Sequence, residues 1–319
     1  MDANVLRSAL VGTWGARTSD ALVAALRGPG AAASDLVELR LDLPRDGAAR
    51  VRELVAASPH PVIATCRRVA EGGRFTAGER DRIDVLLRAA DAGAVWLDVE
   101  DDVPERDVER LAGSGAKLLR SRHVERLPAD AESIAGTLVA LRGDAAKLVA
   151  LHGSAADALR MLTLVRDASG RLAGHIVGVP FTRPASAALG APFVYAALQP
   201  GGRIGLPMTT VLDMRRRNRF GWLAPSRPVF ILIGGNVEGS VSPDMLNVAF
   251  EGRGPDAVAL RWSCDDPAPA LEAIRRFGWI GAAVTTPHKE RVAEILSAES
   301  ASGGSSRGAT PTWRGSSRR

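Results

Sequence analysis

The stretch PVIATCR at 61–67, followed by AGERDRIDVLLRAADAG at 77–93 and AVWLDVE at 94–100, decides the fold of this chain. Its two ends are apolar and rich in β-branched residues, which predicts buried strands. The middle segment spaces its apolar residues by three and four, which is typical of an amphipathic helix. The stretch therefore predicts a strand, a helix and a second strand, the repeating unit of α/β proteins.

The same unit recurs from the start of the chain to about residue 200, at intervals of about 25 residues. One helix is expected to begin with the capping pattern Ser19 and Asp20. Eight strands, each followed by a helix, predict a closed (β/α)8 TIM barrel with its active site at the C-terminal ends of the strands. The predicted strands are LRSALVGTW (6–14), LVELRLDL (36–43), PVIATCR (61–67), AVWLDVE (94–100), KLLRSRH (117–123), AAKLVAL (145–151), GHIVGVP (174–180) and FVYAAL (193–198).

A smaller and incomplete α/β domain is expected after the barrel, because the strand VFILIGG at 229–235 restarts the pattern. A basic, proline-containing segment separates the two. The last residues are rich in Ser, Gly and Arg and cannot form a core, which predicts disorder. We therefore expect a barrel at 1–214, a linker at 215–227, a second domain at 228–297 and a disordered tail at 298–319.

Composition excludes several classes of protein. The two cysteines, Cys66 and Cys264, lie far apart in apolar runs, so neither a disulfide framework nor a metal site is expected, and a reducing cytoplasm fits best. The N-terminal MDANVLRSAL has an acidic residue where a signal peptide needs positive charge, and no apolar run is long enough for a membrane span. The arginines mostly alternate with acidic residues, so the net charge of +5 does not indicate nucleic-acid binding.

Lysine is scarce in this chain, with only Lys117, Lys147 and Lys289 among 41 basic residues. A chain that prefers arginine so strongly keeps lysine where arginine would fail, and one such task is an amine that can lose its proton and form a Schiff base. Compositional drift is the alternative.

Lys147 lies within the sixth predicted strand, where a lysine needs a special reason. A desolvated amine beside arginines has a lowered pKa and could attack a ketone, and His123, after the fifth strand, could move a proton next to the iminium. Several arginines at one barrel mouth also suit a carboxylated substrate. The other polar residues at strand ends are Glu38, Arg40, Arg67, Glu71 and Arg183.

Structural explanations stay open for these residues. Lys147 could extend to solvent, and His123 could be a hydrogen-bonded structural histidine. Glu38 and Arg40 could form an ion pair at the barrel rim. The sequence Glu71, Gly72 and Gly73 could be only a turn, and Arg183 could cap a helix.

Four motifs together resemble type I 3-dehydroquinate dehydratase over about residues 5–212: ELRLDL at 38–43, ATCRRVAEGG at 64–73, SRH…LP at 121–128 and KLVAL at 147–151. The resemblance implies a dehydration in the shikimate pathway of aromatic amino acid biosynthesis, without cofactor or metal. It implies that Lys147 forms an imine with 3-dehydroquinate, that His123 transfers the proton and that Glu71 orients His123. It also implies that the substrate is held by Glu38, Arg40, Arg67 and Arg183.

The chain departs from this family near the substrate lid. The segment GVPFTRP, with Thr182, is shorter than the family's loop, and Leu198 replaces a small polar residue. Gly202 stands in place of the glutamine that would contact the substrate. These losses predict weaker binding more than lost imine chemistry, because the lysine, histidine and glutamate are retained.

The second domain resembles the N-terminal, substrate-binding half of shikimate dehydrogenase, through ILIGGNVEGSVSPDMLNVAF and AAVTTPHKE. The resemblance implies that Ser240 and Ser242 hold a carboxylate and that Thr285 and Lys289 lie at the reacting hydroxyl. Helix capping by Ser242 and a surface position for Lys289 are the alternatives.

Two of the dehydrogenase family's residues are replaced here, by Gly239 and Ala283. No glycine-rich turn follows a strand after residue 290, so the NADP-binding domain of a full-length dehydrogenase is expected to be absent and its activity is not expected. A truncated or frame-shifted bifunctional enzyme is one explanation.

Two further functions are compatible with the sequence. One is a non-catalytic sensor of shikimate-pathway metabolites, and the other is a different imine-forming barrel lyase, such as an aldolase. The expected partner is a small molecule, either 3-dehydroquinate or, at the second domain, shikimate. An oligomer is also compatible with the sequence.

Overall fold

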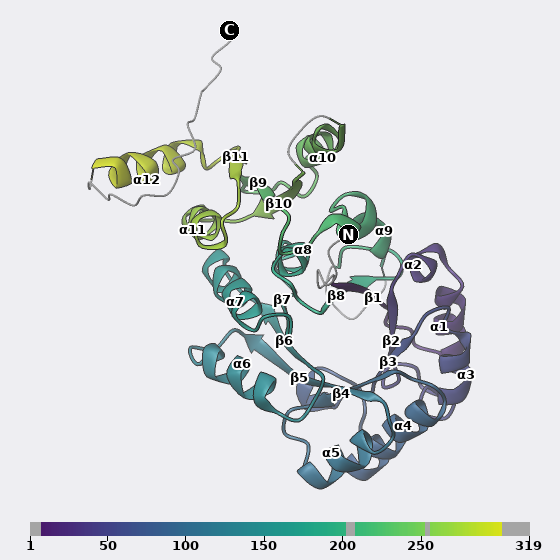
Figure 1. Cartoon of the computed structure of the whole chain (residues 1–319). Helices are drawn as coiled ribbons and strands as arrows, with labels where there is room; N and C mark the ends of the chain where they lie inside the picture. The colour runs from purple at the N-terminus through teal and green to yellow at the C-terminus, as the bar shows by residue number, and fades with distance from the viewer. Residues whose placement is uncertain (1–7, 202–207, 253–255, 302–319) are drawn as a thin grey trace.

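Eight parallel strands form a nearly closed barrel in the first part of the chain (Figure 1). The computed structural model describes residues 8–201, 208–252 and 256–301. Its first sheet has the order β7-β6-β5-β4-β3-β2-β1-β8, and within the described residues β7 and β8 are not paired. The predicted (β/α)8 barrel is therefore confirmed, with one open seam. The strands are β1 (Ala9–Thr13), β2 (Leu36–Arg40), β3 (Val62–Thr65), β4 (Trp96–Glu100), β5 (Lys117–Arg126), β6 (Ala145–His152), β7 (Leu172–Ile176) and β8 (Phe193–Ala197).

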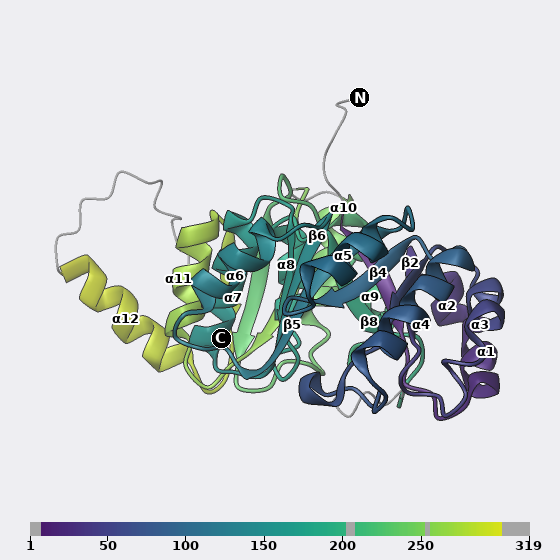
Figure 2. The same ribbon diagram turned by 90° about the horizontal axis from the view of Figure 1, so that it is seen from below.

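Helices alternate with these strands and cover the outside of the barrel (Figures 1 and 2). Helix α4, for example, buries Ile83, Leu86 and Ala89 and exposes charged residues on its other face, as its apolar spacing predicts. The helices of the barrel are α1 (Ser19–Leu26), α2 (Pro29–Ala32), α3 (Val51–Ala57), α4 (Glu79–Asp91), α5 (Glu105–Ala112), α6 (Ala131–Ala140), α7 (Ala155–Asp167) and α8 (Thr182–Ala188), and a short 3-10 turn, η1, spans Val69–Glu71.

Two local predictions need correction. The cap of α1 is Thr18, whose side chain accepts a hydrogen bond from the backbone of Ala21, and Ser19 instead binds Asp46. His123 lies inside β5 rather than after it, because pairing with β6 continues as far as Arg126 and His152. A strand that is longer than its apolar run places polar residues at the barrel mouth.

The second sheet contains three parallel strands in the order β10-β9-β11. Two connecting elements, α9 (Val211–Arg216) and the 3-10 turn η2 (Phe220–Trp222), lead into it, and α9 crosses the boundary expected after residue 214. The elements of this second module are β9 (Val229–Gly234), α10 (Ser242–Gly252), β10 (Val258–Ser263), α11 (Ala268–Phe277), β11 (Gly281–Val284) and α12 (Lys289–Ala301).

Helix α12 differs from the sequence-based expectation, which places disorder from residue 298. The helix continues to Ala301, and the Ser300 hydroxyl donates a hydrogen bond to the Leu296 carbonyl one turn earlier. Residues 302–319 lie outside the described part of the chain. Helix α12 extends away from the rest of the molecule in both views (Figures 1 and 2).

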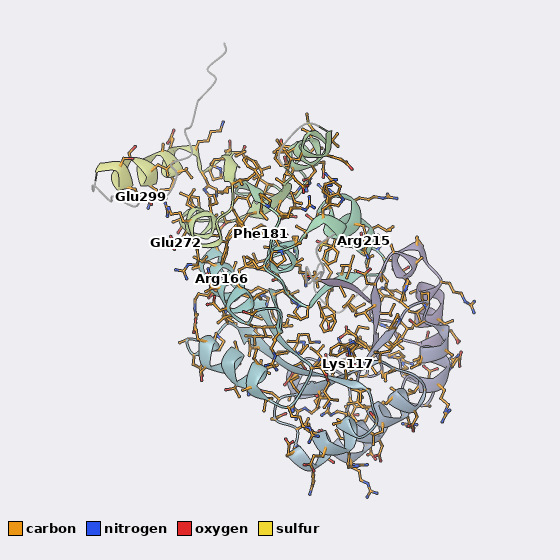
Figure 3. All side chains as sticks on the ribbon, in the orientation of Figure 1. Lys117, Arg166, Phe181, Arg215, Glu272 and Glu299 are labelled. Carbon is orange, nitrogen blue, oxygen red and sulfur yellow. The ribbon has the colours of Figure 1, made fainter. Side chains whose placement is uncertain are left out.

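Aromatic side chains join the second module to the barrel. Phe181, which lies just before α8, is labelled in Figure 3. It stacks on Trp262 of β10 with ring centroids 4.2 Å apart, and Trp279 meets Phe181 edge-on. Arg166 of α7 donates a hydrogen bond to the Arg276 carbonyl of α11. Trp262 and Phe181 are almost completely buried, so the module packs on the barrel beside its open seam. No helix in the described residues is long and apolar enough to cross a membrane.

Candidate active site

The interior of the barrel is built in two layers. Apolar side chains near the start of the strands form a floor: Val11, Leu36, Ile63, Trp96, Leu119, Ala145, Ala173 and Phe193. Side chains that point inward along a strand are two residues apart. The next inward position on each strand therefore forms a second layer, which is mostly polar: Thr13, Glu38, Thr65, Asp98, Ser121, Lys147, His175 and Tyr195.

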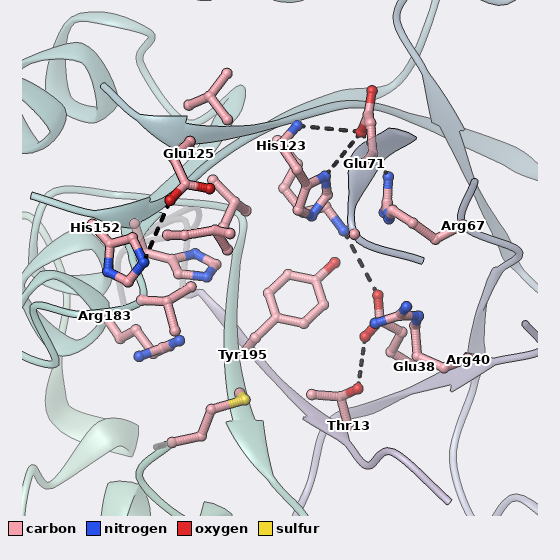
Figure 4. Close-up of a pocket in the computed structure, with 18 of the residues that line it drawn as sticks. Thr13, Glu38, Arg40, Arg67, Glu71, His123, Glu125, His152, Arg183 and Tyr195 are labelled. Carbon is pink, nitrogen blue, oxygen red and sulfur yellow. Dashed lines mark hydrogen bonds and ion pairs between the residues drawn. The ribbon is translucent and has the colours of Figure 1, made fainter. Parts of the chain in front are cut away.

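A pocket of about 560 Å³ opens above this polar layer. All seven residues predicted for the first site line it, although they come from positions up to 145 apart in the chain, from Glu38 to Arg183. Figure 4 shows most of them around one cavity, with Tyr195 near its centre. The barrel brings together what the sequence separates, because the C-terminal ends of parallel strands meet at one face.

Lys147 is almost completely buried, so it does not reach solvent as the structural alternative proposed. Its amine contacts the carboxylate of Asp98 and lies 3.6 Å from that of Glu38. The ring of Tyr195 lies below it, with its centroid 4.8 Å from Nζ. The sequence predicts arginines around this amine, whereas its nearest charged neighbours are the carboxylates of Asp98 and Glu38.

His123 pairs with Glu71. The distance between His123 Nδ1 and Glu71 Oε2 is 3.2 Å, and the backbone amide of His123 donates to the same oxygen (Figure 4). Burial and the positive charges of Arg67 and Lys147 hold the pKa of His123 well below its usual value, so the free imidazole is neutral and can accept a proton.

Glu71 has an unusual pKa for a carboxyl group. Burial raises the pKa of Glu71 to about 7, and the negative charges of Glu100 and Asp98 add to the effect against the opposing charge of Arg67. A carboxylate and an imidazole that both titrate away from their usual values in one cavity are typical of an acid–base site. The turn that carries Glu71 therefore places this carboxyl group in the pocket, in contact with His123.

Arg67 connects these groups from a fully buried position. Its guanidinium contacts Asp98 at 2.8 Å, Glu71 at 3.2 Å and the Ser121 hydroxyl at 3.0 Å. Burial disfavours the charge of Asp98, but Arg67 and Lys147 outweigh it and lower the pKa of Asp98. This carboxylate is therefore ionised between two cations.

Glu38 and Arg40 do not form the ion pair that was one alternative. Glu38 instead accepts hydrogen bonds from the hydroxyls of Thr13, at 2.6 Å, and Thr65, at 3.0 Å. Arg40 makes a two-pronged contact with Asp42. Each of the two predicted residues is therefore held by its own hydrogen-bond partners, and both line the cavity.

Arg183 lies on the opposite side of the pocket from Arg67 (Figure 4). It is almost completely buried, and its Nε and Nη1 atoms have no hydrogen-bond partner among the described residues. Burial alone lowers the pKa of Arg183 to about 10. A buried guanidinium without a counter-ion is costly, and an anionic ligand would satisfy it.

The residues at which this chain departs from the family near the substrate lid lie in different surroundings. The Thr182 hydroxyl binds the backbone at Ile176 and Val179, so it supports the turn between β7 and α8. Leu198 is buried in the main core and does not line the pocket. Gly202 lies outside the described residues.

Sequence reasoning missed Asp98, His175 and Tyr195, which all line or support this site. Each follows an apolar floor residue by two positions, so a search at that spacing would have found them. Asp98 lies inside the predicted strand AVWLDVE, where it follows Trp96 by two positions.

The residues predicted for the second site follow the carboxyl ends of the second sheet. Ser240 and Ser242 come after β9, Thr285 follows β11, and Lys289 begins α12. Ser242 and Lys289 are exposed, and the other two are partly buried. The structure thus places all four at one edge of the sheet, in a more open setting than the barrel site.

Comparisons with known proteins match both parts of the chain. Residues 16–216 match the family described as type I 3-dehydroquinase, and residues 232–306 match the shikimate dehydrogenase substrate binding domain. The chain is 32% identical over 192 residues to a 3-dehydroquinate dehydratase of Methanothermobacter thermautotrophicus, covering 58% of this chain and 84% of that one.

A bifunctional 3-dehydroquinate dehydratase/shikimate dehydrogenase of Arabidopsis thaliana is 27% identical over 268 residues. The match covers 81% of this chain but only 44% of the plant protein. Among solved structures, a type I 3-dehydroquinate dehydratase from Clostridium difficile matches 66% of this chain and 90% of its own, with a TM-score of 0.55 and 17% identity. The dehydroquinate dehydratase and shikimate dehydrogenase from S. pombe matches 91% of this chain and 58% of its own, with a TM-score of 0.53 and 20% identity. These structures support the fold.

Proposed function

This chain belongs to the type I 3-dehydroquinase family through residues 16–216, and from that premise we propose that its barrel dehydrates 3-dehydroquinate to 3-dehydroshikimate through an imine on Lys147. The observation that carries the proposal is the buried Lys147 amine, held between Asp98 and Glu38 in a cavity that also contains the His123 and Glu71 pair. No metal or organic cofactor takes part in these steps.

In the first step the Lys147 ammonium group gives a proton to neutral His123, and the resulting amine attacks the substrate ketone. The nitrogen then passes a proton to the former ketone oxygen, and His123 returns its proton to the same oxygen, which leaves as water. The product is a protonated imine, which withdraws electrons from the neighbouring carbon. The carboxylate of Asp98 stabilises the positive charge of this iminium, as it stabilises the ammonium group in the free protein. The adjacent C–H bond becomes acidic because its electron pair can move into the C=N bond.

The second step is the elimination itself. Neutral His123 accepts the proton from this C–H bond, and the electrons form an enamine. His123 then gives its proton to the leaving hydroxyl, which departs as water while the C=C–C=N system forms. Hydrolysis of the imine releases the product and restores Lys147. Glu71 positions His123 and balances its charge while it carries the proton.

Substrate binding is assigned to the remaining predicted residues. Arg183 would bind the carboxylate, because its buried guanidinium lacks a partner among the described residues. Glu38, Arg40 and Arg67 would hold the hydroxyl groups on the other side of the cavity.

Reductive trapping tests this proposal directly. Borohydride added with 3-dehydroquinate should leave one adduct, located on Lys147 by peptide mass spectrometry. A Lys147→Ala variant should lose both the adduct and the formation of 3-dehydroshikimate, by at least about 1000-fold in kcat. The Lys117→Ala variant, on the same barrel but stacked on Trp96 at the start of β5, is the matched control and should keep both.

Other results would point to the alternatives. Turnover by Lys147→Ala would refute the covalent mechanism. Tight binding of 3-dehydroquinate without product would indicate a sensor. An adduct with phosphorylated aldehydes or ketones, but none with 3-dehydroquinate, would indicate an aldolase-like lyase.

We also propose that the second module binds shikimate at the edge formed by Ser240, Ser242, Thr285 and Lys289. Their common position after parallel strands, and the match to a substrate binding domain, support this. Calorimetry with shikimate on the Lys147→Ala variant measures the second site with the barrel inactive. Adding Lys289→Ala to this variant should abolish the heat assigned to the second site, and unchanged binding would contradict the assignment.

A further inference from the structure

The barrel pocket has two halves, which differ in whether their polar groups have hydrogen-bond or ion-pair partners. On the side of β2 to β6, the charged groups bind one another, as in the contacts of Lys147 with Asp98 and of Glu71 with His123. On the side of β7 and β8, several polar atoms lack a partner among the described residues. Buried polar atoms without partners are rare in native proteins and commonly mark the place of a ligand.

Tyr195 is one of these unsatisfied residues. It is 4% exposed, and its hydroxyl has no hydrogen-bond partner in the described structure. Its ring packs under the Lys147 amine, so the residue lies next to the atom proposed to react. In Figure 4 its hydroxyl points toward the side of the cavity that holds Arg67 and Glu71. A phenylalanine would fill the same space without burying an unpaired hydroxyl.

His175 is the second. It lines the same pocket, is 7% exposed and makes no hydrogen bond to a described residue through its ring. Its ring lies 6.1 Å from that of Tyr195. Burial and the positive charges of Arg183 and Lys147 hold its pKa well below the usual value. The imidazole is therefore neutral and offers one N–H donor and one acceptor.

Arg183 completes this half of the pocket, with two buried guanidinium nitrogens unpaired. The three residues come from neighbouring elements, β7, β8 and the start of α8, beside the open seam of the barrel. Together they combine a fixed positive charge, a neutral N–H donor and a phenolic hydroxyl. This set matches a ring that carries one carboxylate and several hydroxyl groups.

We infer that His175 and Tyr195 are specificity-determining residues of this site, with His175 donating a hydrogen bond to the carboxylate bound by Arg183 and Tyr195 binding a ring hydroxyl beside the imine carbon. The inference rests on the proposed function of the barrel. It also explains how this chain could hold its substrate although its lid segment lacks the glutamine that the family resemblance leads one to expect, since the contacts come from strands instead.

Steady-state kinetics with 3-dehydroquinate on the full chain test the inference. Tyr195→Phe removes one hydroxyl, and His175→Met removes the ring nitrogens at similar volume. Each should raise KM about tenfold, the usual effect of one lost hydrogen bond to a charged or polar ligand group, and should change kcat less than threefold. His175→Gln restores an N–H donor and should recover part of the loss. His60→Met, at a partly buried histidine outside the pocket, is the matched control.

The outcomes separate this inference from the proposed function. If the wild type turns over and both variants keep its KM, His175 and Tyr195 only fill space and the inference fails. If the wild type shows no turnover and no borohydride adduct, the proposed function fails, and calorimetry with quinate takes the place of kinetics. The same tenfold losses in quinate affinity would then support the binding roles, whereas equal affinities, or no quinate binding by the wild type, would overturn them. Thermal unfolding of each variant shows whether it is folded, and Tyr195→Phe makes the smallest change.

Discussion

Asp98 makes the burial of Lys147 possible. An isolated ammonium group inside a protein is costly, and it persists only where opposite charges and hydrogen bonds compensate for lost water. Asp98 contacts Lys147 and Arg67, and it also accepts a hydrogen bond from the Ser121 hydroxyl at 2.5 Å. Lys147 is therefore held by a network in a defined position, which favours reaction with a bound ketone.

Glu71 gives the site a predicted dependence on pH. Since its pKa is about 7, acidification through pH 7 protonates it, removes the negative charge beside His123 and should lower kcat/KM of the wild type. Glu71→Gln should lower kcat/KM at pH 8 by about 10- to 100-fold and flatten this limb of the profile. Rate measurements from pH 5.5 to 9 check this, and Glu132→Gln, on the exposed face of α6, should leave the profile unchanged.

The same group affects stability with the opposite sign. The folded-state pKa of Glu71 is raised from 4.5, so the fold favours the protonated form. Its contribution to stability is therefore present below about pH 4.5 and is lost as the pH rises through 7. Urea unfolding should show Glu71→Gln gaining stability relative to the wild type between pH 5 and 8. A constant difference across this range would contradict the raised pKa.

At the scale of elements, the turn after β3 positions two site residues at once. Gly72 ends η1 in the left-handed region, with φ of 75°, and Gly73 packs against the backbone of Arg67. Arg67 and Glu71 lie on either side of this close approach and contact each other at 3.2 Å. The Glu71, Gly72 and Gly73 sequence is therefore a turn, and its geometry also serves the pocket.

Gly73→Ala should disturb this turn. The new Cβ would lie 2.0 Å from the Arg67 carbonyl oxygen, so the backbone must move. We expect a loss of about 1–3 kcal/mol in the free energy of unfolding and a fall in kcat/KM, measured by urea unfolding and kinetics. Gly136→Ala, in the exposed middle of α6 where nothing lies within 4 Å, should instead stabilise by about 0.5–1 kcal/mol without changing kinetics. An equal effect of both variants would contradict the packing argument.

At the scale of the whole molecule, the second module supports the side of the barrel that holds Arg183. Phe181 stacks on Trp262 and lies two residues before Arg183 in the chain. β7 and β8 are not paired in the described structure. Side-chain packing must therefore help to hold this side of the barrel together, which hydrogen bonds between strands do elsewhere. The fused module is thus joined to the active site through aromatic contacts.

Trp262→Ala removes that support. It should lower the free energy of unfolding by about 3–5 kcal/mol, because it leaves a cavity at a fully buried indole. It should also raise KM for 3-dehydroquinate more than it lowers kcat. The packing of Phe181 beside Arg183 is lost, whereas the contacts that hold Lys147 and His123 are unchanged. Calorimetric unfolding and steady-state kinetics check both effects. Met245→Ala, at an exposed residue of α10, is the control, and an unchanged KM in folded Trp262→Ala would show that the module acts on stability alone.

Much of this protein follows from local sequence. The alternation of β-branched and amphipathic segments was enough to predict the (β/α)8 barrel, because strand and helix periodicity are properties of short stretches of chain. The motifs around Glu38, Glu71, His123 and Lys147 were enough to predict the dehydratase family, which the comparisons confirm. The roles of the individual site residues remain predictions.

The remaining features depend on tertiary structure. Asp98 and His175 look like ordinary strand residues until the barrel fold turns them inward next to an apolar floor, because strand register decides which side chains meet. The stacking of Phe181 on Trp262 joins segments 81 positions apart, and no local pattern predicts it. Sequence determined which elements form and named seven candidate residues for the barrel site. Only the folded barrel decided which charges are paired and which polar atoms still need a ligand, because burial and charge pairing depend on neighbours that lie far apart in the chain.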